Sequence, residues 1–256
     1  VNAYEFKLIF KRGKRMKVAV LSDIHGNEVA LDAVLEDIER QGIEEILYLG
    51  DLVAKGPQPL KVVNKLDSLE LACWLQGNTD MWFEEITEGW EPTCDREEYL
   101  YEFYKYMDSL LAEDIVSFLT SLPIEDALEF EGVDIRCVHG SPRSVIEIMD
   151  GSTAEGELKE MVAEVEEDVI VCGHSHRPYI GEIEEKKIIN VGSVGSPYDG
   201  DNRASYAVLE ITEGQVESEI KRVDYNIEEL LAIADKRDFP FSDEYAESIR
   251  NGTNPA

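Results

Sequence analysis

The sequence predicts an α/β fold that opens with three βα units and continues into a region rich in strands. Three short apolar runs before residue 80 have the length of buried strands, and a segment with helical spacing follows each of them. From residue 133 onward, apolar runs follow one another at short intervals, with glycine-rich turns between some of them. The chain has 256 residues, 43% of them hydrophobic, so it is long enough to bury a full core.

The first βα unit begins with a strand expected over 18–21, an apolar run typical of a strand buried on both faces. Asp23 and His25 follow it, and they project to the same side if the backbone stays extended. Asn27 can cap the next helix, and Gly42 ends it. That helix carries apolar residues at the i, i+3, i+4 and i+7 positions, namely Leu31, Val34, Leu35 and Ile38.

The next two units repeat this arrangement. A strand expected over 46–49 ends at Asp51, and a helix follows near 60–66. A third strand, over 71–75, ends in a Gly-Asn-Thr-Asp turn that contains Asn78. Each of the three units therefore places a metal-capable side chain at the carboxyl end of a strand, where open α/β sheets bind their ligands.

Residues 81–122 differ from the units before them, because they are aromatic, acidic and helical. One expected helix carries an apolar stripe made of Tyr99, Leu100, Phe103, Tyr104, Met107, Leu110 and Leu111. A short helix over 114–122 follows and stops before Pro123. Such a stripe is more typical of core packing than of a base-stacking platform. We expect a helical insertion within the domain, placed where it can act as a cap that selects substrates.

The second half predicts further strands, and the first two of them end in histidines. These strands are expected over 133–138 and 169–172, and the residues directly after them include His139, His174 and His176. The other expected elements are a helix near 155–165, strands near 179–183, 187–191, 205–211 and 215–223, a helix near 227–236 and one short helix in the tail.

The chain is predicted to form one domain over 16–236, because it contains no internal repeat and no linker long enough to divide it. Residues 1–15 precede it as an extension that lacks the apolar segment and cleavage site of a signal peptide. We expect this extension to be an extra strand or a tag-like segment, with Met16 as the natural start. Residues 237–256 form a C-terminal tail.

Composition limits the partners and the compartment. The chain has 55 acidic and 24 basic residues, a formal net charge of −31, and such a surface disfavours nucleic acid as a stable partner. No apolar run is long enough to span a bilayer, so we expect a soluble protein without a membrane partner. The four cysteines form no Cys-x-x-Cys pair, which favours a reducing cytoplasm over a disulfide framework.

All four histidines of the chain fall at predicted strand ends, beside glycine, serine or aspartate; they are His25, His139, His174 and His176. A core histidine lies more often inside an apolar run or on a helix face. The shared position therefore favours a metal site, together with Asp23, Asp51 and Asn78. Mixed imidazole, carboxylate and amide ligands suit manganese, iron, cobalt, nickel or zinc better than calcium or magnesium.

Five separated motifs resemble the calcineurin-like metallophosphoesterase superfamily in order and spacing: Asp23-x-His25, Gly50-Asp51, Gly77-Asn78-x-Asp80, His139-Gly140 and Gly173-His174-x-His176. The stretches SDIHGN, GPQP, HGSPR and NVGSVGSPYDGD resemble its small phosphodiesterase-like branch. The resemblance covers about residues 17–223. It implies a four-layer αββα sandwich of two mixed β-sheets flanked by helices, which agrees with βα units first and strands later.

The resemblance also implies a dinuclear metal centre that hydrolyses a small phosphoester, more specifically a phosphodiester or a nucleotide-like substrate. One metal would be held by Asp23, His25, Asp51 and His176, and the other by Asp51, Asn78, His139 and His174, with Asp51 as the bridge. Two divalent ions, manganese first among the candidates, would share a hydroxide that attacks phosphorus. The catalytic residues implied are Asp51, Asn78 and Asp80, with Asp80 supporting the ligands rather than acting as an acid.

One position departs from the resemblance. Many members of the superfamily have a histidine where this chain has Thr79, and threonine cannot be a general acid at neutral pH. We therefore expect good leaving groups to be favoured. Asn78 and Arg143 are the expected substrate contacts, although Arg143 could equally pair with a surface acid. A phosphomonoesterase, a diadenosine-polyphosphate hydrolase and a catalytically weak binding scaffold stay open as alternatives, as does the oligomeric state.

Overall fold

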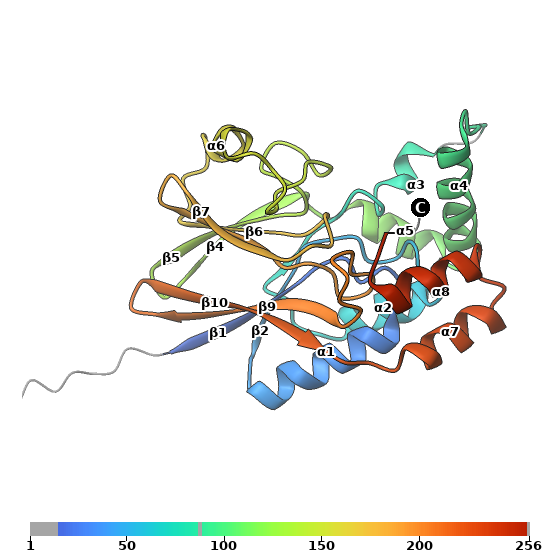
Figure 1. The fold of residues 1–256 in the computed structure, drawn as a ribbon, viewed down its shortest axis with the longest axis horizontal. Coiled ribbons are helices and arrows are strands. Elements are labelled where there is room, and N and C mark those ends of the chain that lie inside the picture. The colour runs from blue at the N-terminus through green and yellow to red at the C-terminus, as the bar shows by residue number, and fades with distance from the viewer. Residues whose placement is uncertain (1–14, 87–88, 255–256) are drawn as a thin grey trace, which may run out of the picture.

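The computed structural model describes residues 15–86 and 89–254. They form two five-stranded β-sheets with helices on both outer sides (Figure 1). The extension predicted for residues 1–15 lies outside the described residues except for its last position.

The first sheet has the strand order β10-β9-β1-β2-β3. β1 (Met16–Leu21) pairs in parallel with β2 (Glu45–Tyr48), and β2 pairs in parallel with β3 (Cys73–Trp74). On its other side, β1 pairs antiparallel with β9 (Ala204–Thr212), whose hairpin partner is β10 (Gln215–Val223). The predicted βα units thus supply the parallel half of a mixed sheet, although β3 is shorter than expected.

The second sheet has the strand order β4-β5-β6-β8-β7 and is also mixed. Its centre is parallel and consists of β5 (Val133–Val138), β6 (Val169–Cys172) and β8 (Lys186–Asn190). Its edges, β4 (Glu125–Phe130) and β7 (Tyr179–Ile183), pair antiparallel with their neighbours. The sequence did not predict β4, because its side chains alternate between exposed and half-buried and no apolar run marks them.

Packing on both faces of each sheet creates four layers. Along β1, Val20 lies in the core between the two sheets, and its neighbour Leu21 contacts the helices on the outer face. That outer face packs against α1 (Glu28–Gln41) and α2 (Pro59–Asp67), and α6 (Glu155–Val162) covers the outer face of the second sheet. The predicted αββα sandwich is therefore confirmed.

The insertion and the C-terminal segment pack together at one end of the molecule (Figure 1). Their helices are α3 (Trp82–Glu85), α4 (Asp95–Asp108), α5 (Glu113–Thr120), α7 (Ile227–Lys236) and α8 (Ser242–Asn251). Phe103 and Met107 of the predicted stripe are buried, and the Phe103 ring lies 5.4 Å from that of Phe239. Most of the stripe therefore packs inward, whereas Leu110 is exposed, and the predicted tail helix is present as α8. The domain limits stay a prediction.

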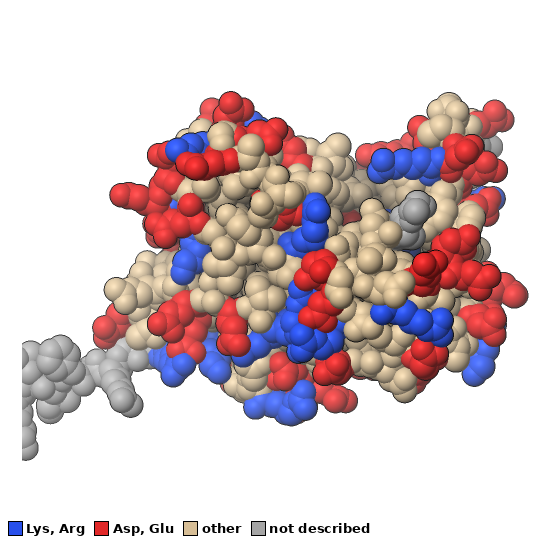
Figure 2. Space-filling model, in the orientation of Figure 1, with Lys and Arg blue, Asp and Glu red and all other residues tan. Residues whose placement is uncertain are grey.

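The surface carries the negative charge that the composition requires. Figure 2 shows acidic side chains over much of the face in view, with basic side chains interspersed. Within 15–86 and 89–254, no helix combines the length and the apolar character needed to cross a bilayer.

Candidate metal centre

The loops that follow five strands meet at one edge of the sandwich. Backbone hydrogen bonds join them: Asp23 N–H donates to Gly50 O at 3.0 Å, and Gly173 N–H donates to His139 O at 2.8 Å. Glycine is required where they approach, because a Cβ on Gly77 would lie 2.2 Å from Asp51 Oδ1. The structure thus brings together all seven metal-ligand residues predicted from the sequence: Asp23, His25, Asp51, Asn78, His139, His174 and His176.

The backbone at this edge is left-handed rather than extended. Positive φ angles occur at Asp23 (55°), His25 (48°), Asp51 (60°), His174 (64°) and His176 (57°). Such angles are uncommon outside glycine and are maintained only where surrounding contacts fix them. Asp23 and His25 do lie together, as expected, but the predicted cause, side-chain alternation along an extended strand, is wrong. They come together because the chain turns sharply at each of them.

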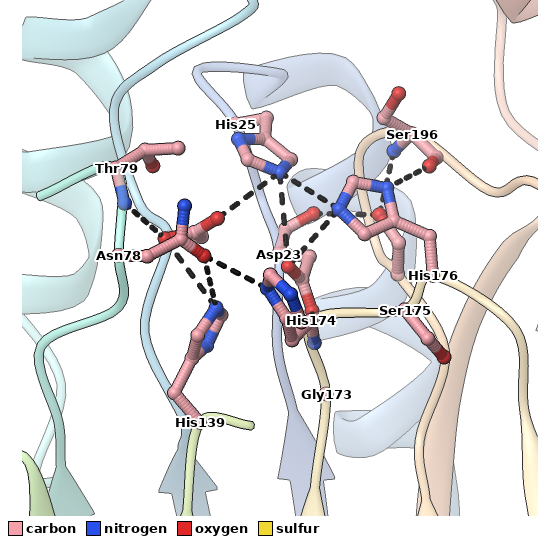
Figure 3. Close-up of polar contacts among 12 residues, drawn as sticks. Asp23, His25, Asn78, Thr79, His139, Gly173, His174, Ser175, His176 and Ser196 are labelled. Atoms are coloured by element: carbon pink, nitrogen blue, oxygen red, sulfur yellow. Dashed lines mark hydrogen bonds and ion pairs between the residues drawn. The ribbon is translucent and has the colours of Figure 1, made fainter. Parts of the chain in front are cut away.

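A first group of four side chains converges in a fully buried space. His25 Nδ1 donates to Ala54 O at 2.9 Å, and His176 Nδ1 donates to Ser196 O. The two Nε2 atoms lie 3.1 Å apart (Figure 3). Asp23 Oδ1 lies 3.1 Å from His176 Nε2, and Asp51 Oδ2 lies 3.6 Å from His25 Nε2. One ligand atom from each residue falls within 4.8 Å of all the others.

These four atoms are all acceptors when the imidazoles are neutral. A carbonyl oxygen can only accept, so each Nδ1 carries the ring proton and each Nε2 presents a lone pair. Asp23 Oδ1 is buried and accepts no hydrogen bond. Two lone pairs and two carboxylate oxygens facing one another need a positive charge between them. The residues therefore fit a cation, and nitrogen and oxygen donors of this kind suit a transition metal.

A second group lies beside the first and shares Asp51 with it. His139 Nδ1 donates to Leu49 O at 2.8 Å, and its Nε2 lies 3.1 Å from Asn78 Oδ1 and 3.5 Å from Asp51 Oδ1. His174 Nδ1 lies 2.8 Å from the same Asn78 oxygen (Figure 3). Asp51 thus turns one carboxylate oxygen toward each group.

The ionisation of the histidines depends on burial and on their neighbours. Burial lowers the pKa of His174 to about 4, and the nearby His139 adds to this effect. Burial also lowers the pKa of His25 well below its usual value, and the Lys55 charge acts in the same direction. Burial opposes the charged form of His139 as well, but the Asp51 carboxylate outweighs it and raises the pKa of His139 to about 9. Within the second group, positive charge is therefore favoured at His139 and disfavoured at His174.

The Asp80 carboxylate accepts hydrogen bonds from the backbone of the loops after β2 and β3 and does not face the ligand atoms. Its carboxylate accepts N–H bonds from Asp51 at 2.8 Å, from Leu52 at 3.0 Å and from Gly77 at 3.0 Å. Burial and the charge of Asp51 raise the pKa of Asp80 to about 7, although the hydrogen bonds from Gly77 and Leu52 oppose this. These contacts are those of a residue that positions Asp51.

Thr79 contributes its backbone to this loop and leaves its side chain unpaired. Its N–H donates to Asp51 Oδ1 at 2.8 Å, which orients the shared carboxylate. Its hydroxyl oxygen is buried and has no hydrogen-bond partner.

The sequence predicted Arg143 as a substrate contact and made no prediction for Lys55. Arg143 pairs with Glu147 at 2.7 Å and approaches Glu160 at 3.8 Å, which is the surface pairing that the sequence left open. Lys55 is half-buried in the loop after β2, and its charge lowers the pKa values of both His25 and Asp51. Sequence reasoning missed Lys55, because a lysine in a turn-rich loop carries no signal of its own.

Comparisons with known proteins agree with this geometry. Residues 16–214 match the calcineurin-like phosphoesterase superfamily domain. An uncharacterised protein of Methanocaldococcus jannaschii is 34% identical over 227 residues, which cover 82% of this chain and 88% of the relative. The phosphodiesterase YfcE of Escherichia coli is 27% identical over 204 residues, 76% of this chain and 88% of YfcE.

Solved structures share the fold. A crystal structure of a metallophosphoesterase from Sphaerobacter thermophilus superposes with a TM-score of 0.75 and 27% identity, covering 93% of this chain and all of that one. A hypothetical protein from Pyrococcus horikoshii gives a TM-score of 0.81 at 20% identity, covering 94% of this chain and 100% of its own. Since the family match spans most of the chain and the buried Asp and His cluster is present, the chain belongs to the calcineurin-like phosphoesterase superfamily and is a phosphoesterase.

Proposed function

We propose that the chain hydrolyses phosphodiesters at a centre that holds two divalent cations. The observation that carries this proposal is the position of Asp51. Its Oδ2 faces the first ligand group, its Oδ1 faces the second, and the side chain is almost fully buried. A carboxylate placed in this way serves as a bridge between two cations.

Each of the two groups of side chains would supply the ligands of one cation. Asp23, His25, Asp51 and His176 would hold one, and Asp51, Asn78, His139 and His174 would hold the other. Imidazole nitrogen together with carboxylate and amide oxygen favours manganese as the first candidate, with iron, nickel, cobalt or zinc as alternatives. When bound, such a pair supplies a Lewis-acid centre for the phosphoryl oxygens and an activated water for attack on phosphorus.

Hydrogen bonds within the chain fix the orientation of the imidazole rings and of the Asp51 carboxylate. Three histidines are held through Nδ1 by the carbonyl oxygens of Ala54, Leu49 and Ser196. This bond sets the tautomer that leaves Nε2 free to bind a metal. Asp51 is oriented by the Thr79 N–H.

Substrate binding needs a positive side chain beside the cations, because the rest of the surface is strongly acidic. Lys55 is our candidate for this side chain, because it is half-buried in the loop after β2 and its charge lowers the pKa values of both His25 and Asp51. We assign to Lys55 the contact with substrate phosphate that the sequence assigned to Arg143, which is paired with Glu147. Asn78 keeps its proposed contact through the amide nitrogen, since its oxygen faces the two histidines.

The residue at position 79 favours substrates with good leaving groups. Threonine cannot donate a proton to a departing alkoxide at neutral pH, so esters whose leaving group needs no proton react best. The preference for a diester over a monoester is supported by the name of the YfcE relative, a phosphodiesterase. The compartment that we propose is a reducing cytoplasm, because all four cysteines are free and three of them are buried.

The test compares two aryl esters after metal exchange. The full chain is stripped with a chelator, reloaded with manganese, and assayed with bis(p-nitrophenyl) phosphate and p-nitrophenyl phosphate, while bound metal is counted by elemental analysis. We expect about two manganese ions per chain, activity that depends on them, and a higher kcat/KM for the diester. Uptake of a single ion, or faster hydrolysis of the monoester, would contradict the proposal.

A further inference from the structure

The glycine-rich loop over 191–203 contacts two residues of the first ligand group. It joins β8 to β9 and so crosses from the second sheet to the first. Gly195 N–H and Ser193 Oγ both donate to Asp23 O, at 2.9 and 2.8 Å. Glycine is required at position 195, because a Cβ there would lie 1.8 Å from Ile24 O. The loop therefore holds the backbone of Asp23 in place.

The same loop contacts His176 in three ways. His176 Nδ1 donates to Ser196 O (Figure 3), and Tyr198 N–H donates to His176 O at 3.1 Å. The Tyr198 ring also lies on the face of the imidazole, with the two ring centroids 4.1 Å apart and an angle of 15° between the ring planes. His176 is almost fully buried and Tyr198 is half-buried. The tyrosine ring therefore covers one face of a buried imidazole.

This stack restricts a motion of the imidazole that the hydrogen bond leaves open. A hydrogen bond from Nδ1 fixes the direction of one ring atom, but the ring plane can still tilt about that bond. A second ring lying parallel against its face fixes the tilt. The tilt matters because the Nε2 lone pair lies in the ring plane, and this atom lies 3.1 Å from both Asp23 Oδ1 and His25 Nε2.

The stack gains an electrostatic contribution when a cation is bound at Nε2. Such a cation draws electron density out of the imidazole, and the face of a tyrosine ring attracts positive charge. The stack therefore stabilises the form with metal more than the form without it. In the second ligand group, His139 and His174 meet edge to face instead, with centroids 5.3 Å apart. The effect of Tyr198 should therefore be confined to one of the two cations.

We propose that Tyr198 is a positioning residue of the metal centre, whose ring holds the His176 imidazole in the plane that directs Nε2 toward its cation. This inference rests on the proposed two-cation centre and adds to it a residue that binds no metal itself. Contacts that do not use the tyrosine ring fix the loop beside it, such as the bond from Gly200 N–H to Gly252 O at 2.9 Å. Replacing the ring should therefore leave the loop in place.

The proposal is tested by calorimetry on the full chain, stripped with a chelator and titrated with manganese. We expect Tyr198→Leu to weaken one of the two manganese affinities about tenfold and to leave the other unchanged. Tyr198→Phe keeps the ring and should keep both affinities. The matched control is Tyr101→Leu, at a half-buried tyrosine of α4 whose ring stacks on Tyr104, and it should change neither affinity.

A loss at one cation alone separates positioning from a purely structural role. A ring that only supports the fold would lower the Tm of the metal-free Tyr198→Leu protein and weaken both affinities alike or neither, and either result would overturn the proposal. Equal weakening by Tyr198→Phe and Tyr198→Leu would do the same, because the ring would not be the cause. If Tyr198→Leu does not fold, Tyr198→Met takes its place with the same expected results.

The wild-type titration separates this inference from the proposed function. A wild-type chain that binds fewer than two ions would contradict the two-cation centre and this inference with it. Two ions bound with the same affinities by the wild type and by Tyr198→Leu would overturn the role of Tyr198 alone.

Discussion

Replacing Asp51 with asparagine tests the point where the two ligand groups meet. The change keeps the shape of the side chain and an oxygen for the Thr79 N–H, but it removes one negative charge from a buried position. The two carboxylate oxygens lie 3.6 and 3.5 Å from the Nε2 atoms of His25 and His139. At about 4 Å and an effective dielectric constant of about 20, a pair of unit charges interacts by about 4 kcal/mol. We therefore expect metal affinity to fall by about three orders of magnitude.

The assay measures manganese binding by titration of the stripped protein and diester hydrolysis at saturating substrate. We expect bound manganese to drop to at most one ion per chain at micromolar metal, and turnover to fall with it. Asp134→Asn, an exposed position on β5, is the matched control and should change neither quantity. An Asp51→Asn protein that binds two ions with wild-type affinity would refute the bridging role and the charge argument together.

Three further predictions concern the residues around the centre. Thr79→His should raise the kcat for alkyl phosphoesters by up to about 100-fold and change the kcat for aryl esters little, which a series of leaving groups would measure. An unchanged or lower rate on alkyl esters would count against the argument that a general acid is missing. Lys55→Met should raise KM for the diester about tenfold with little change in kcat, whereas Arg143→Met should change neither; the reverse pattern would restore Arg143 as the substrate contact. Because the Asp51 carboxylate overcomes burial and raises the pKa of His139 to about 9, the metal-free protein holds a proton there at pH 7. Manganese affinity should therefore rise about tenfold per pH unit between pH 7 and 9. Calorimetry in buffers of different ionisation enthalpy should show about one proton released per chain on manganese binding at pH 7. Binding without proton release would contradict this prediction.

The metal-capable residues could be predicted because strand ends are visible in the sequence. Apolar runs mark the centres of β1, β2, β5 and β6, and the polar residues directly after them must lie at the carboxyl ends of parallel strands. The position of each side chain relative to the others was not predictable in the same way. Asp23 and His25 meet through left-handed turns that depend on contacts with distant loops, such as the bond from Asp23 N–H to Gly50 O.

The sequence did not predict the elements and contacts that depend on tertiary packing. β4 has no apolar run; its alternate residues Leu128 and Phe130 pack against the core between the sheets, and its pairing with β5 makes it a strand. Proximity to the His139-Gly140 motif led to the expectation that Arg143 contacts substrate. The structure pairs Arg143 with Glu147, and Lys55, whose charge acts on His25, has no motif beside it that could mark it.

The centre draws its ligands from both sheets, and this division has a consequence for biosynthesis. The first 80 residues supply Asp23, His25, Asp51 and Asn78, and the opposing sheet contributes the other three histidines only after residue 138. A nascent polypeptide still attached to the ribosome therefore lacks the complete ligand set until His176 has emerged. On the proposed function, a product truncated before His176 would lack part of the ligand set, and complete loading with cations would have to follow the emergence of His176.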